Sequence, residues 1–326
     1  MKLYVIAFLC SVLVTLLAGY VILPILKKWK VGQTISEFMT ESHAAKQGTP
    51  TIGGLIFLSG AVLVSVILSF FNISQGAHLY LTCLMCMLVF GALGFADDAL
   101  KVMRRQNEGL TVKQKLFPQI LFAVLIAVNA CFSKGIGSRI ALPFTEKTLN
   151  LGLFYIPIMA IIIVAIDNSA NLMDGLDGLL SGSSAIIFAA FGLYALTRPE
   201  EGMTNVAVFS FSMSGALVAF HRFNFFPARV FMGDCGSLAI GGAIAGIAIV
   251  TKGALLLPFM LIMLIVTTGS DIAQVIYMRR HQGRKLMRMS PLHHHLQMGG
   301  MQETTVVTLY NVITFIGCAV ALILFA

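Results

Sequence analysis

The chain has 326 residues, of which 58% are hydrophobic and 11% are charged, and its formal net charge is +8. A soluble domain carries roughly 25% charged residues, so this composition excludes a chain that faces water over most of its surface. The basic residues are scattered over many short segments, and the positive charge therefore does not indicate a nucleic-acid partner.

Ten apolar segments follow one another along the chain, most of them near the roughly 20 residues that a membrane-spanning helix needs. The segments are continuous rather than alternating, which favours helices over the strands of a barrel. We therefore predict an all-α polytopic membrane protein with about ten transmembrane helices, forming a single integral domain over residues 1–326. The predicted spans are 3–26, 52–72, 79–96, 114–132, 154–168, 179–197, 204–221, 236–251, 254–277 and 305–325.

The first span differs from a cleaved signal peptide. Its apolar run extends from Leu3 to Leu26 and is followed by Lys27, Lys28 and Lys30. The core of a signal peptide is usually about 7–15 residues long, so we expect an uncleaved membrane helix. The six cysteines have no zinc-type spacing and fall mostly inside spans, where we expect them to be apolar packing residues without disulfides.

The distribution of basic residues predicts the topology. The segments that follow odd-numbered spans hold 16 of the Lys and Arg residues, and the other side holds 6. Because positive loops stay in the cytoplasm, odd-numbered spans should end inside and both termini should be extracytoplasmic. In the longest outer loop, 139–144 and 148–151 are expected to pair as a small β-hairpin.

All seven aspartates fall on the predicted cytoplasmic side, each at or near the end of a span. Ionisable groups at membrane depth are costly and tend to mark function. Carboxylates near an interface, with Lys, Arg and His beside them, suit Mg²⁺ and phosphate chemistry. The seven are Asp97, Asp98, Asp167, Asp174, Asp177, Asp234 and Asp271.

Asp97 and Asp98 close the third span, in the string GFADDALK. Adjacent carboxylates repel each other and need a cation or a raised pKa, and Lys101 is within helical reach of both. The alternative is a solvated helix end with an ordinary ion pair. Further along, Arg104, Arg105, Lys113 and Lys115 could hold phosphates or simply set the topology.

The segment from Asp167 to Gly178 has three carboxylates and two side-chain amides, without Lys or Arg to balance them. Helical spacing would put Asp167, Asn171 and Asp174 on one face, and the two Asp-Gly steps favour turns. A polar hairpin between two helices is the alternative, but it leaves the uncompensated charge unexplained.

Asp234 lies in a glycine-flanked turn before the eighth span, in the string FMGDCGS. It could be a metal ligand or could cap the next helix. Phe231, three residues earlier, could stack on a base or anchor the chain at the membrane interface.

Two further strings lie in predicted cytoplasmic loops. KQGTPTIGG leads into the second span, and its glycines could bring backbone amides close to a ligand or merely begin a helix. SPLHHH follows a basic stretch in the last loop. Three successive histidines rarely converge on one zinc ion, so phosphate ligands or proton donors fit better, with a bland polar loop as the alternative.

Taken together, these five strings resemble the phospho-N-acetylmuramoyl-pentapeptide transferase family, of the polyprenyl-phosphate N-acetylhexosamine-1-phosphate transferase superfamily, over essentially the whole chain. GFADDALK, NSANLMDGLDGL and FMGDCGSL carry the superfamily resemblance, and KQGTPTIGG and SPLHHH point to the muramoyl branch. The resemblance implies a multi-pass protein of the bacterial inner membrane, a cytoplasmic-facing cleft and a homodimer. It also implies a reaction with Mg²⁺ in which UDP-MurNAc-pentapeptide and undecaprenyl phosphate give lipid I and UMP.

The resemblance also implies residue roles. Asp234 is similar to the Mg²⁺ ligand, and Asp98 to a base or nucleophile at the lipid phosphate. After the histidines, Leu296, Gln297 and Met301 depart from the family pattern, which puts the role of an acid or Trp there in doubt. The other implied catalytic residues are Asp97, Lys101, Lys113, Asn171, Asp174, His293, His294 and His295, and the implied substrate-binding residues are Lys46, Gly175, Leu176, Asp177, Asn224, Phe231 and Gln274.

Two other functions stay open at this point. A sibling enzyme would move GlcNAc-1-phosphate to the same lipid, and competition between the two UDP-sugars would distinguish it. An ion-coupled transporter would place its site near the bilayer midplane, often between inverted repeats, whereas these aspartates lie at the rim. Asp271 matches no catalytic role, and we expect it to pair with a cation such as Arg279 or with a neighbouring helix.

Overall fold

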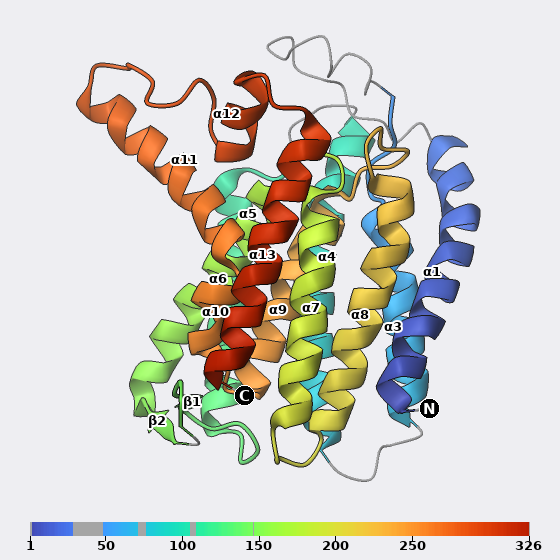
Figure 1. The fold of residues 1–326 in the computed structure, drawn as a ribbon, viewed down its shortest axis with the longest axis vertical. Coiled ribbons are helices and arrows are strands. Elements are labelled where there is room, and N and C mark those ends of the chain that lie inside the picture. Colours follow the sequence, from blue (N-terminus) through green and yellow to red (C-terminus); the bar gives the residue numbers. More distant parts are fainter. Residues whose placement is uncertain (1, 29–47, 71–75, 105–108, 146, 326) are drawn as a thin grey trace.

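A computed structural model describes residues 2–28, 48–70, 76–104, 109–145 and 147–325. Helices dominate this part of the chain (Figure 1). They are α1 (Leu3–Lys28), α3 (Gly54–Phe70), α4 (Ala77–Arg104), α5 (Val112–Phe132), α6 (Tyr155–Met173), α7 (Leu179–Thr197), α8 (Met203–Asn224), α9 (Gly233–Val250), α10 (Leu257–Met260), α11 (Ile262–Arg280), α12 (Leu292–Met298) and α13 (Glu303–Phe325), with short 3₁₀ turns at Gly152–Phe154 and Ala254–Leu256.

Each predicted span corresponds to a helix or helix pair. Among the described residues, eight helices are long and apolar enough to cross a membrane, and the pair α10–α11 adds a ninth if it is one span. The predicted total of about ten also includes 52–72, which forms the shorter helix α3 of 17 residues. The predicted span 254–277 is not one straight helix, because the chain bends by 76° between α10 and α11. The bend lies within an uninterrupted apolar run, so hydropathy does not reveal it.

Helix α9 occupies the centre of the bundle. Every residue from Cys235 to Val250 is buried, as expected for a helix that is apolar on all sides. Helix α4 approaches it closely because glycines face the contact. A Cβ at Gly94 would overlap the backbone of Asp234, and one at Gly242 would lie 2.5 Å from the carbonyl oxygen of Cys86. Close packing of α4 against α9 therefore determines where the ends of the two helices meet.

The two ends of the bundle differ. Both chain termini lie at the end that also carries β1 and β2, and α12 lies at the opposite end (Figure 1). Strands β1 (Arg139–Ala141) and β2 (Thr148–Asn150) pair antiparallel, with Ile140 opposite Leu149, which confirms the predicted hairpin. Helix α11 leans away from the bundle, and the chain returns from it to α12 (Figure 1).

Candidate active site

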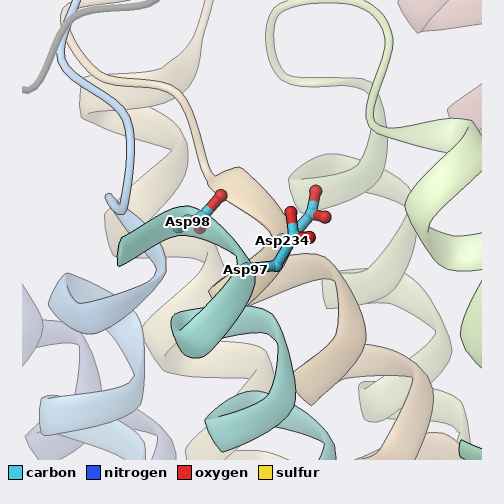
Figure 2. A group of neighbouring side chains, drawn as sticks. All are labelled: Asp97, Asp98 and Asp234. Atoms are coloured by element: carbon cyan, nitrogen blue, oxygen red, sulfur yellow. The ribbon is translucent and has the colours of Figure 1, made fainter. Parts of the chain in front are cut away.

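Three carboxylates meet at the end of the bundle opposite the hairpin. Asp97 and Asp98 lie near the end of α4, and Asp234 lies in the first turn of α9. Figure 2 shows the Asp97 and Asp234 side chains close together, with Asp98 beside them. Each of the three offers an oxygen within 4.8 Å of the others. Residues separated by more than 130 positions in the sequence are therefore brought to one point by the α4–α9 contact.

Backbone amides hold two of these carboxylates. The Leu110 amide donates to Asp97 Oδ1 over 2.7 Å, and the Cys235 amide donates to Asp98 Oδ2 over 2.9 Å. The second bond means that Asp98, from α4, satisfies an amide in the first turn of α9. Asp234 is not the N-cap of that helix, because Met232 occupies the cap position and makes no side-chain cap bond.

Two lysines join the carboxylates. Lys101 contacts Asp97, and its Nζ lies 3.2 Å from Asp234 and 3.6 Å from Asp98. Lys115 Nζ lies 2.7 Å from Asp234 Oδ2 and donates to Asn171 Oδ1 over 3.2 Å. Asn171 donates in turn to Asp234 Oδ1 over 2.9 Å. Asn171 thus joins α6 to the cluster.

Lys113 lies elsewhere, although the resemblance pointed to it. It is exposed, whereas Lys115 is partly buried and reaches Asp234. Residues that are two positions apart on an α-helix are rotated by about 200° around its axis, so Lys113 and Lys115 face nearly opposite directions. The start of α5 is fixed by a capping box between Thr111 and Gln114. Counting helical positions from that cap could have selected Lys115.

The donor set of the cluster fits a hard divalent cation. Carboxylate oxygens are the protein ligands that Mg²⁺ prefers, and Asp97, Asp98 and Asp234 form the one group of three or more such residues found among the described residues. Three carboxylates face the two lysines Lys101 and Lys115, so one negative charge remains for a cation to balance. The residues therefore suit Mg²⁺ chemistry.

The segment from Asp174 to Asp177 lies against the histidines. A Cβ at Gly175 would overlap Nε2 of His293 and would lie 3.1 Å from Nε2 of His294. Burial raises the pKa of the Asp174 carboxyl well above its usual range, and the Asp234 charge adds to this effect. Leu176 is buried in the apolar core.

The three histidines have different surroundings. His293 is fully buried, and its two ring nitrogens have no hydrogen-bond partner among the described residues. Burial lowers the pKa of His293 to about 3, and His294 adds to the effect. His295 Nδ1 instead accepts a bond from the Arg288 amide over 3.1 Å. The triplet does not form a metal-binding group with other described residues.

Asp177 is tied to two distant segments. Its amide donates to Glu303 Oε1 over 2.7 Å, and its Oδ2 accepts from the Ala228 amide over 2.9 Å. Gln297 also donates to Glu303, over 3.5 Å. Glu303 opens α13 and was not among the predicted site residues. Gln297, the departure from the family pattern, thus reaches a buried acid that lies six residues further on.

The other predicted substrate-binding residues lie in different parts of the structure. Asn224 is buried and bonds the Val230 carbonyl over 3.1 Å, next to the partly buried Phe231. Gln274 lies in α11, where its amide bonds backbone groups of Leu286 and Met287. These bonds hold the loop after α11, and the structure does not bring Gln274 to the carboxylate cluster. Lys46 lies outside the described residues.

Asp271 was expected to pair with a cation such as Arg279 or with a neighbouring helix, and its partner is Ser290, in the segment that leads into α12. Its Oδ1 accepts from Ser290 Oγ over 2.7 Å, and the neighbouring Ser270 Oγ accepts from the Leu292 amide over 2.9 Å. Both bonds hold the segment that begins α12. Asp271 therefore joins α11 to the histidine segment.

The fold and this cluster define a multi-pass helical membrane protein with an acidic, lysine-lined site suited to phosphate chemistry. Residues 80–252 match the family model described as glycosyl transferase family 4. The chain is also similar along its length to curated proteins named phospho-N-acetylmuramoyl-pentapeptide-transferase. One from Clostridium perfringens is 38% identical over 97% of this chain and 95% of its own length. One from Halalkalibacterium halodurans is 39% identical over 95% and 93%, and one from Thermoanaerobacter pseudethanolicus is 40% identical over 96% and 95%. The chain belongs to the phospho-N-acetylmuramoyl-pentapeptide transferase family.

Proposed function

We propose that this chain transfers phospho-MurNAc-pentapeptide from its UDP donor to undecaprenyl phosphate, giving lipid I and UMP in peptidoglycan synthesis. Membership of the transferase family supports the reaction and its substrates. The observation that carries the proposal is the convergence of Asp97, Asp98 and Asp234 with Lys101 and Lys115 at the end of apolar helices. A phosphoryl transfer between a soluble nucleotide and a membrane lipid needs such a site at the membrane rim.

Asp234, with Asp97 and Asp98, is the group that would hold Mg²⁺. When bound, the ion would supply charge neutralisation for the diphosphate and for the UMP leaving group. The fit rests on oxygen ligands that lie within 4.8 Å of one another and on the negative charge left over in the cluster.

The lysines give the site its affinity for phosphates. Lys101 and Lys115 both lie within 3.2 Å of Asp234 Oδ2, so two ammonium groups point at one position. Ammonium groups act as point charges toward phosphate oxygens, and here two of them can orient the donor diphosphate or the lipid phosphate. Asp98 Oδ2 is bound to the Cys235 amide, which leaves Oδ1 as the atom that could accept a proton from the lipid phosphate.

We assign the carboxylate end of the bundle to the cytoplasmic face of the bacterial plasma membrane. The excess of Lys and Arg after odd-numbered spans supports this orientation, and UDP-sugars are cytoplasmic metabolites. Single cysteines introduced at positions in 133–153 and 282–290, in a background without other accessible cysteines, should be labelled from outside and inside respectively. Labelling of both loops from the same side would contradict the assignment.

A homodimer, which the family resemblance implies, is tested by light scattering of the purified protein.

Release of UMP by the detergent-purified protein tests the reaction. We expect release with UDP-MurNAc-pentapeptide plus undecaprenyl phosphate, and none when either Mg²⁺ or the lipid is omitted. Release with UDP-GlcNAc instead would make the chain the sibling GlcNAc-1-phosphate transferase. Release that continues after the metal is chelated would contradict the role given to Asp234.

A further inference from the structure

A chain of hydrogen bonds beside Asp177 involves two residues that belong to none of the site assignments, Ser181 and His221. Ser181 Oγ lies 2.9 Å from His221 Nδ1 and donates to Asn224 Oδ1 over 3.0 Å. Asn224 Nδ2 then donates to the carbonyl of Val230 over 3.1 Å. These hydrogen bonds thus connect the last turn of α8, which holds His221 and Asn224, with Ser181 in the first turn of α7 and with the loop that precedes α9.

The direction of every bond in this chain follows from its last acceptor. A carbonyl oxygen only accepts, so the amide nitrogen of Asn224 must face Val230, and its Oδ1 must face Ser181. Ser181 has one hydroxyl proton, which this amide oxygen takes. The Gly178 carbonyl, 3.3 Å from Ser181 Oγ, is a further acceptor and leaves the result unchanged. His221 must therefore donate from Nδ1 to Ser181.

Gly178 and Phe225 both lie against the imidazole of His221. Gly178 adopts φ +81°, and a Cβ there would lie 2.7 Å from His221 Cε1, so glycine gives the ring its room. The Phe225 ring lies 5.3 Å from the imidazole, centroid to centroid. The donor is thereby fixed against the segment that carries Asp177.

The loop at the end of this chain, residues 225–231, leads directly into the site. Ala228 is tied to Asp177 over 2.9 Å, and the Phe231 amide is tied to the Pro50 carbonyl over 2.8 Å. The Phe231 carbonyl in turn accepts from the Gly53 amide over 2.9 Å, and the bond to Val230 adds a tether immediately before Phe231. The hydrogen bonds that end at Val230 are therefore among those that set the position of Phe231, three residues before Asp234.

We propose that His221 is a positioning residue for the donor nucleotide. Through Ser181 and Asn224 it fixes Val230, and so sets the position from which Phe231 meets the uridine ring. The inference rests on the proposed function, in which this side of the site binds a uridine nucleotide.

The test is the Kd for UMP in the presence of Mg²⁺, measured by calorimetry on the full-length protein in detergent. His221→Leu keeps an apolar contact with Phe225 but removes the donor, and we expect Kd to rise roughly fivefold to thirtyfold, as when a buried group loses its partner. His221→Asn places an amide donor near the position of Nδ1 and should restore most of the affinity. In turnover, His221→Leu should raise KM for the UDP-sugar more than it lowers kcat.

Ser214→Ala is the matched control. Ser214 Oγ donates to the Ala185 carbonyl over 2.8 Å, so it also joins α8 to α7 by a buried bond, but away from the loop. This variant should lose thermal stability without any change in Kd. If His221→Leu and Ser214→Ala lower Tm alike and both leave Kd unchanged, His221 only supports packing and the proposal is wrong.

Two more variants keep the test decisive. Ser181→Ala breaks the same chain at its middle and should match His221→Leu, which covers the case in which the leucine variant does not fold. In an Asn224→Ala background, His221→Leu should add little further loss, because both changes act through one chain. Independent, additive losses would overturn the proposal. Absence of UMP binding by the unaltered protein would instead overturn the proposed function itself.

Discussion

The two ends of α9 each carry a charged cluster, and the clusters are built differently. At one end, Asp234 meets two other carboxylates and two lysines. At the other, just past the helix, Lys252 Nζ lies 3.1 Å from Glu200 Oε1, and Arg198 Nε lies 3.7 Å from Glu200 Oε2. There a single carboxylate is flanked by two cations, and no second carboxylate lies against it in these pairs.

The second cluster has a clear structural use. The Lys252 carbonyl accepts from the Ala141 amide over 2.8 Å, so the ion pair and this bond together join the α7–α8 loop, the end of α9 and strand β1. The first cluster brings three repelling carboxylates together, and its two lysines leave one negative charge unbalanced. Like charges held together at a cost indicate a binding function, whereas opposite charges that link loops indicate a structural one.

The strongest test of this difference exchanges one carboxylate for an amide at each end. Asp234→Asn removes the proposed metal ligand, and we expect turnover to fall by about 100-fold or more, as for loss of an electrostatic stabiliser of the transition state. The Mg²⁺ concentration needed for half-maximal activity should rise as well. Glu200→Gln, the same chemical change at the other end, should leave both quantities near those of the parent. If Asp234→Asn keeps the parent's Mg²⁺ dependence, Asp234 is not a metal ligand and the proposed difference between the two ends of α9 is wrong.

The second test compares two lysines on one helix. Lys115→Met removes an ammonium that lies 2.7 Å from Asp234, and turnover should fall roughly tenfold to 100-fold. Lys113→Met changes an exposed side chain two residues away and should stay within about twofold of the parent. Steady-state kinetics of the two variants, at matched Mg²⁺, give the answer. Equal losses would restore Lys113 as the lysine of the cleft.

These two lysines also show how far the sequence predicts the site. The apolar runs located the helices, and the two short strings 139–144 and 148–151 located the hairpin, because both depend on neighbours in the chain. The grouping of Asp97, Asp98 and Asp234 was expected from their motifs. The assignment of Lys113 stays a prediction, and the structure adds that Lys115 contacts Asp234, which motif matching alone did not indicate because it ignores which way each residue of a helix faces.

Contacts between distant segments could not be predicted from the sequence for a related reason. Glu303 bonds the Asp177 amide across 126 positions, and nothing local marks it. The bend between α10 and α11 lies within a continuous apolar run, and Gln274 faces the loop after α11 because of that helix's direction. Each of these depends on how helices pack, which residue type and spacing do not specify.

The third test concerns the structural cluster. Glu200→Gln should lower stability by about 1 kcal/mol, the usual size for a partly exposed ion pair, while activity is retained. Thermal unfolding in detergent, followed together with turnover of the same sample, checks both. A variant with the parent's Tm would mean that the pairs at this end contribute nothing, and one without activity would mean that the two ends of α9 are coupled.

The last test concerns the pH dependence of stability at His293, which lies in α12 near the carboxylate end of the bundle. Its pKa is lowered to about 3 by burial and by His294, whereas an unfolded histidine has a pKa near 6.5. Between these values the unfolded chain binds a proton that the folded chain does not. Stability contributed by neutral His293 is therefore present above pH 6.5 and is lost as the pH falls toward 3, by at most about 1.4 kcal/mol per pH unit. In His293→Phe, which has no titrating group, Tm should fall less steeply than in the parent between pH 6.5 and 4.5. His281→Gln, at an exposed position, should keep the parent's slope. If Tm falls equally steeply with pH in the parent and in His293→Phe, the folded protein does not hold the His293 ring neutral. The segment around the histidines would then admit water when the pH falls.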